Sequence, residues 1–75
     1  MMRLSYNKAE DTIINKGTSQ NAKIIIVIEG SLKLRKNNQI IAVKGQVLGD
    51  PYDDKCYEDD IIMQTDGVIS EVLSK

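Results

Sequence analysis

The chain has 75 residues, enough for one small domain and too few for a second independent core. Ile and Val account for 16 of these residues, Phe and Trp are absent, and Pro occurs once, a composition that favours strands over helices. Ten basic and eleven acidic residues give a net charge of -1, which offers no electrostatic footprint for nucleic acid or an anionic membrane.

The cysteine and histidine content excludes two kinds of cross-link, disulfides and zinc sites. Cys56 is the single cysteine and there is no histidine, so neither an internal disulfide nor a zinc site can form, and a reducing, cytoplasmic setting is expected. The longest apolar run, residues 24–28, is far shorter than the roughly 20 residues that span a bilayer, so we expect a soluble chain.

The first predicted strand follows a polar opening and is centred on Ile13 and Ile14, before a turn at Gly17. Residues 18–21 read as loop. Residues 23–28 form a β-branched run without helical periodicity, which predicts a strand buried on both faces or nearly so.

A hairpin is predicted next. Residues 31–36 alternate with period two, which places leucines on the core side and Lys33 and Arg35 in water. Asn37 and Asn38 supply a tight turn, because Asn tolerates positive φ, and residues 39–43 return as the partner strand. A turn at residues 44–46 then precedes a two-residue apolar stub.

Residues 50–60 hold six acidic side chains without core periodicity, which predicts a surface loop or a single helical turn. Strands at 61–63 and 68–73 follow. Seven or eight short strands separated by turn residues are typical of a sandwich, jelly roll or barrel, so we predict an all-β, antiparallel β-roll. The side chains expected to point inward are Leu32, Leu34, Ile26, Ile28, Val43, Ile62 and Ile69.

The order and spacing of three segments, residues 13–17, 25–30 and 43–50, resemble those of a cyclic-nucleotide-binding domain, a cupin-like β-roll. The likeness extends over about residues 5–73, and Gly17, Gly30 and Gly45 stand where the roll turns a corner and a Cβ would clash. The helices that flank the roll in the family have no counterpart. The resemblance therefore implies that residues 1–75 are a single domain and a fragment of a larger regulatory protein.

The most similar domain that we can name is the degenerate third cyclic-nucleotide-binding domain of apicomplexan cGMP-dependent protein kinases. Residues 23–34 carry that resemblance, together with Gly49 and Asp50 at the point where competent pockets read Gly-Glu. In the family, this Glu accepts from the ribose, so Asp50 could replace it. The simpler interpretation of Asp50, between Gly and Pro, is a turn or N-cap residue.

A competent pocket also needs an Arg that neutralises the phosphate, about ten positions after the cassette Gly. Residues 57–60 read Tyr-Glu-Asp-Asp there, no Arg follows Arg35, and the nearby cation is Lys55. A carboxylate about 6 Å from a phosphate costs roughly 3 kcal/mol at an effective dielectric near 20. Pro51 also removes one backbone N–H from the cassette. Gly49, Asp50 and Lys55 are therefore predicted to form a vestigial nucleotide pocket.

The acidic segment also suggests Ca²⁺ chemistry, but its spacing does not match an EF-hand loop, and a solvated face is the simpler interpretation. We expect no metal site and no catalytic residue, because no histidine is present to activate Cys56. Tyr52 and Tyr57 could cover apolar surface or dock a neighbouring helix.

Three functions are compatible with these features. The first is a non-catalytic regulatory module of a cGMP-dependent serine/threonine kinase, which relays activation between neighbouring domains of the same chain, binds cyclic nucleotide weakly or not at all and needs no cofactor. The second is a functional cGMP or cAMP sensor that uses Asp50, Lys55 and loop N–H groups. The third, a cupin-like enzyme, is disfavoured because catalytic cupins take metal ligands from histidines.

Overall fold

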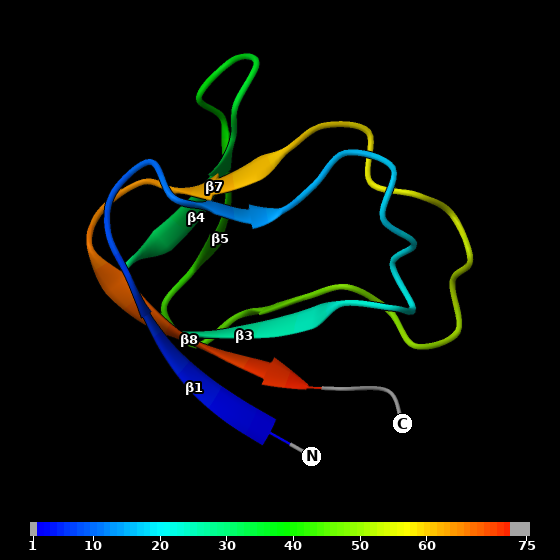
Figure 1. Cartoon of the computed structure of the whole chain (residues 1–75), viewed down its shortest axis with the longest axis horizontal. Coiled ribbons are helices and arrows are strands. Elements are labelled where there is room, and N and C mark those ends of the chain that lie inside the picture. The colour runs from blue at the N-terminus through cyan, green and yellow to red at the C-terminus, as the bar shows by residue number, and fades with distance from the viewer. Residues whose placement is uncertain (1, 73–75) are drawn as a thin grey trace.

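The computed structural model describes residues 2–72 and places eight strands in two four-stranded antiparallel sheets (Figure 1). The first sheet has the order β1-β8-β3-β6 and the second has the order β2-β7-β4-β5. The strands are β1 (Met2–Asn7), β2 (Thr12–Ile14), β3 (Ile24–Glu29), β4 (Ser31–Leu34), β5 (Ile40–Val43), β6 (Val47–Leu48), β7 (Ile61–Met63) and β8 (Gly67–Val72). The predicted all-β antiparallel roll is confirmed.

Strand β1 is the one strand that the sequence analysis left out. It pairs with β8 through six consecutive residues, from Met2 opposite Val72 to Asn7 opposite Gly67, without a bulge. The predicted strand at Ile13 and Ile14 is confirmed as β2, but it is the second strand of the chain and not the first. Leu4 and Tyr6 of β1 are 65% and 82% exposed, so this strand adds little to the core.

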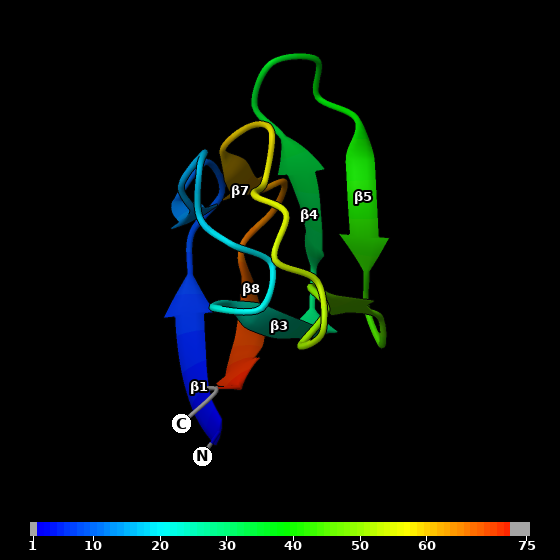
Figure 2. The same ribbon diagram turned by 90° about the vertical axis from the view of Figure 1, so that its right-hand side faces the viewer.

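The core lies between the two sheets, which Figure 2 shows from the side. Strand β3 contributes Ile25 and Val27, both fully buried, whereas Ile28 is 39% exposed. The prediction that this strand is buried on both faces or nearly so was wrong, because Ile26 on the second face is only half-buried and Ile28 is exposed. The inward direction predicted for Ile26, Ile28 and Val43 was also wrong: Ile26 lies outside the core cluster, and Val43 is 45% exposed. An aliphatic run alone does not identify its buried face, because alternate side chains of any strand point to opposite faces.

The hairpin formed by β4 and β5 is confirmed. Asn38 has a positive φ of 59°, as the Asn-Asn turn requires, and the N–H of Leu34 donates to the carbonyl of Gln39 at 2.9 Å. The pairing shifts in register between Leu32 and Lys33, which is a β-bulge in this hairpin.

Ile62 is 1% exposed but lies outside the central cluster. It stands opposite Lys33 in the β4–β7 pairing and therefore shares the outer face of the second sheet with that residue. The side chain of Lys33 is only 13% exposed and pairs with Glu10 at 3.1 Å, while Arg35 donates to Thr12 at 2.6 Å. The expectation that Lys33 lies in water was therefore wrong, because its side chain is largely buried and its ammonium pairs with Glu10.

The corner glycines differ in what holds them. At Gly30, φ is 92° and a Cβ would lie 3.3 Å from the backbone oxygen of Asp66. At Gly17 and Gly45, a Cβ would meet nothing within 4 Å, so positive φ and not a clash favours glycine there. Residues 2–72 contain no helix with the length and apolar character to cross a membrane.

Candidate functional site

The segment expected to form the nucleotide cassette, residues 49–60, connects β6 to β7 as a loop without a helical turn. It lies beside residues 17–20, and Figure 1 shows the two loops together at one end of the roll. The N–H of Tyr57 donates to the carbonyl of Thr18 at 2.8 Å, and the N–H of Gly17 donates to the carbonyl of Tyr57 at 3.0 Å. These bonds hold the acidic loop against the body of the domain.

Tyr57 anchors this loop to the first sheet. Its ring is buried in the core cluster, and its hydroxyl donates to the backbone carbonyl of Lys23 at 3.0 Å. Burial raises the pKa of the Tyr57 hydroxyl. Gly49 packs against the same pair, since a Cβ there would lie 2.7 Å from the Lys23 oxygen and 2.9 Å from the Tyr57 Oη. Of the two interpretations of Tyr57, the structure supports the one in which it covers apolar surface.

Asp50 folds its carboxylate back onto its own loop. Its Oδ1 accepts from the N–H of Tyr52 at 2.9 Å, and its backbone carbonyl accepts from the N–H of Asp53 at 3.2 Å. This geometry is that of an Asx turn, in which a side chain stabilises a backbone turn. Lys55 is exposed in the same loop, and its N–H donates to the carboxylate of Asp53 at 2.9 Å.

Asp59 and Asp60 accept hydrogen bonds from two other segments of the chain. They stand at the positions where a cyclic-nucleotide-binding domain would be expected to carry an Arg. Asp59 accepts from the N–H of Lys36 at 2.8 Å, and this bond holds the pKa of the Asp59 carboxyl below its usual value. Asp60 accepts from the N–H of Lys16 at 2.7 Å and pairs with the Nε of Arg35 at 3.3 Å. Both carboxylates therefore tie the acidic loop to neighbouring turns.

Because the folded-state pKa of Asp59 is depressed, its stabilising contribution is present above the unfolded pKa of about 4 and is lost as pH falls through the folded pKa. Replacement by Asn keeps a carbonyl acceptor and removes the titrating group. We therefore expect Asp59→Asn to be less stable than the wild type at pH 7, and the two proteins to converge in stability below pH ~4. Urea unfolding at several pH values measures this difference, and a constant difference at all pH values would contradict it.

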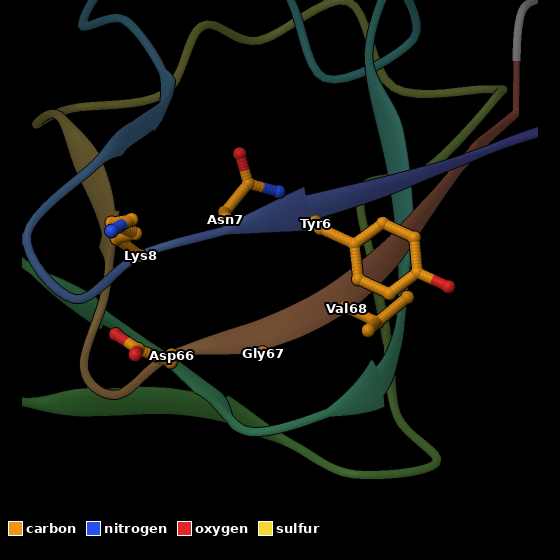
Figure 3. A pocket seen from close by; sticks show the side chains of 6 residues that line it. All are labelled: Tyr6, Asn7, Lys8, Asp66, Gly67 and Val68. Carbon is orange, nitrogen blue, oxygen red and sulfur yellow. The ribbon is translucent and has the colours of Figure 1, made fainter.

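Two further features of residues 2–72 bear on ligand binding. No group of three or more acidic or cysteine side chains in this part of the chain is arranged to hold a metal ion. An open hollow of about 430 Å³ lies where β1 ends and β8 begins, away from the acidic loop (Figure 3). It is lined by Tyr6, Asn7, Lys8, Asp66, Gly67 and Val68. The hollow is therefore a different place from the expected cassette.

No protein-family model matches the chain, and no curated protein sequence does either. Solved structures share its fold, and two of them are regulatory subunits of protein kinase A. One is the regulatory subunit of a cAMP-independent protein kinase A from Trypanosoma brucei, with a TM-score of 0.76, 20% identity and coverage of 96% of this chain and 28% of that chain. The other is cAMP-bound PfPKA-R, with a TM-score of 0.74, 20% identity, and coverage of 96% and 27%. The chain thus has the jelly roll of these proteins and spans little more than a quarter of their lengths.

Proposed function

We propose that this chain is a non-catalytic regulatory module of the cyclic-nucleotide-binding type, within a cGMP-dependent serine/threonine protein kinase. It relays activation between neighbouring domains of that kinase and does not hold a nucleotide itself. Its fold, shared with two regulatory subunits of kinases, supports the regulatory class. The proposal places the module in the cytoplasm, a reducing setting that suits its exposed Cys56.

The fold alone does not determine whether a nucleotide binds. Of the two structures, one is described as cAMP-independent and the other as cAMP-bound, although both have 20% identity and nearly the same TM-score. Nucleotide binding must therefore be argued from the side chains of the loop at residues 49–60.

The main support for the proposal is that the carboxylates of this loop are engaged in hydrogen bonds within the fold. Asp59 and Asp60 accept backbone hydrogen bonds from other segments, and the bond from the Lys36 N–H lowers the pKa of the Asp59 carboxyl, so its charged form is the one that the fold stabilises. A negative charge built into this position repels a phosphate, where a guanidinium would have attracted it. Asp50 is engaged with the N–H of Tyr52, and Pro51 has no N–H to offer.

The alternative is a cyclic-nucleotide sensor, and one observation favours it. Lys55 is exposed on the same loop, where its ammonium could reach an anionic ligand. A single flexible ammonium lacks the bidentate geometry by which Arg binds phosphate, so this cation alone would bind a nucleotide weakly.

Calorimetric titration with cAMP and cGMP separates the two functions. We expect both dissociation constants to exceed about 100 μM, since the phosphate has no guanidinium partner in the loop. Low-micromolar affinity for either nucleotide would overturn the proposal in favour of the sensor.

A substitution tests whether the cassette has been located correctly. Asp59→Arg removes the repelling carboxylate and supplies a guanidinium, so we expect it to tighten cyclic-nucleotide binding at least about tenfold, or ~1.4 kcal/mol. Asp54→Arg is the matched control, because it makes the same charge change at an exposed position of the same loop. Equal effects of the two substitutions would mean that net charge alone acts, and that the alignment of Asp59 is wrong.

A further inference from the structure

Among residues 2–72, strand β1 is the longest edge strand, and Arg3 is its one charged residue. It pairs with β8 on one side only, and its six residues carry neither a bulge nor a proline. The other edges are shorter or irregular: β6 has two residues, β2 has three and a register shift, and β5 has four and a register shift in its pairing with β4. Proteins normally blunt such edges with short strands, bulges or charges.

The hydrogen-bond pattern identifies which backbone groups of β1 face the open edge. Val27 exchanges bonds with the β6 side, donating to Gln46 and accepting from Gly45, so Ile26 points its backbone groups toward β8. Its partner there is Ser70. By the same alternation, Ile69 and Glu71 point toward β1 and pair with Ser5 and Arg3.

It follows that the N–H and C=O groups of Leu4 and Tyr6 point outward, away from β8. The bonds just beyond the strand agree with this alternation. The N–H of Ala9 donates to Asp66, next to the start of β8, whereas the N–H of Lys8 bonds to Asp11 within its own turn.

The outer side chains of the same strand are apolar and strongly exposed. Leu4 and Tyr6 lie on the face opposite the core, where Leu4 stands opposite Ser70 and Tyr6 stands opposite Val68. Figure 3 shows the Tyr6 ring beside Val68 at the rim of the hollow. Within residues 2–72, the apolar Ile62 on the outer face of the second sheet is 1% exposed, whereas Leu4 and Tyr6 on the outer face of β1 are not covered.

We propose that β1 pairs antiparallel with β1 of a second copy of this chain, about a two-fold axis at Ser5. This register places Leu4 opposite Tyr6 of the second copy, and Tyr6 opposite Leu4 of the second copy. The outward backbone groups of each pair then exchange two hydrogen bonds, and each exposed apolar side chain gains an apolar neighbour. Arg3 lies opposite Asn7, so the two copies bring no like charges into register.

The pairing is self-complementary, as a two-fold interface must be, and it joins the first sheets of both copies into one continuous sheet. Its buried area is small compared with the roughly 1,200–2,000 Å² of stable complexes, so the dimer is weak. We expect a dissociation constant on the order of 100 μM.

Cysteine cross-linking tests the register directly, in a Cys56→Ser background that removes the native thiol. Ser5→Cys places two thiols at the axis, where Cα atoms about 4.5 Å apart suit a disulfide. Oxidised glutathione takes the two electrons and two protons that the bond releases. Arg3→Cys is the control, because the register separates its two copies by about 13 Å.

We expect the Ser5→Cys chain to dimerise covalently at least ten times faster than the Arg3→Cys chain. Equal rates, or no covalent dimer from Ser5→Cys, would overturn the proposal. Sedimentation equilibrium tests the unmodified chain: Tyr6→Lys should raise the dimer dissociation constant at least tenfold, and Tyr52→Lys, at an exposed loop position, should leave it unchanged. A wild-type chain that remains monomeric at about 1 mM would also overturn the proposal.

Discussion

Replacing Gly67 by alanine is expected to destabilise the chain by about 3 kcal/mol or more, a large part of the stability of a domain this small. A Cβ at this position would overlap the carbonyl oxygen of Glu29 and lie 2.9 Å from the Cε of Met63. The Met63 side chain can move, but the Glu29 carbonyl belongs to the strand that pairs with β8 and can shift only if that pairing opens. Urea unfolding followed by far-UV circular dichroism measures the loss.

Gly45→Ala provides the matched control. Gly45 has a positive φ of 89°, but a Cβ there would meet nothing within 4 Å. Only the backbone strain remains, so we expect a loss of about 1–2 kcal/mol. Equal losses at the two glycines would show that the structure accommodates a Cβ at Gly67 and that the steric overlap there costs little.

The strands of this fold could be predicted because β-branched runs and turn residues are local signals. The alternation after Gly30 and the pair Asn37 and Asn38 define β4, the hairpin and β5 without reference to the rest of the molecule. The same local logic could have found β1, since apolar Leu4 and Tyr6 alternate with polar Ser5 and Asn7. The signal was missed because it lies in a segment rich in polar residues.

The faces of the strands were harder to predict. Residues 24–28 are all aliphatic, so their sequence does not distinguish the face with Ile25 and Val27 from the face with Ile28. The choice is made by contacts with the second sheet, which are distant in sequence. Which face of this strand is buried is therefore decided by the tertiary structure and not by the local sequence.

The candidate site divides in the same way. The sequence places Gly49, Asp50 and Lys55 in one loop, and the structure finds them there between β6 and β7. The partners of the acidic residues were beyond prediction, because the bond from Lys16 to Asp60 spans 44 residues and involves a backbone N–H that any residue could supply. No residue pattern marks such a contact.

Ile62→Ala is expected to destabilise the chain by about 2–4 kcal/mol, as for a fully buried aliphatic side chain. Ile62 is buried on the outer face of the second sheet, where it stands opposite Thr12 and Lys33. Ile40→Ala is the control, because Ile40 is 46% exposed at the edge strand β5, and its loss should stay within about 1 kcal/mol. Urea unfolding measures both, and equal losses would show that the cover over Ile62 excludes no water.

The role of Lys33 in the burial of Ile62 can be tested directly, because Lys33 stands opposite Ile62 in the β4–β7 pairing and its ammonium pairs with Glu10. We expect its alkyl stem to pack over Ile62. The Glu10 carboxylate is 66% exposed, so the ion pair itself should contribute little. Lys33→Met keeps an apolar stem and removes the charge, and we expect a change within about 0.5 kcal/mol. Lys33→Ala removes the stem, exposes Ile62 to water and should cost about 1 kcal/mol or more. If both substitutions lower the free energy of unfolding by the same amount, the stabilising part of Lys33 would be its charge, acting through the ion pair with Glu10, and not its alkyl stem.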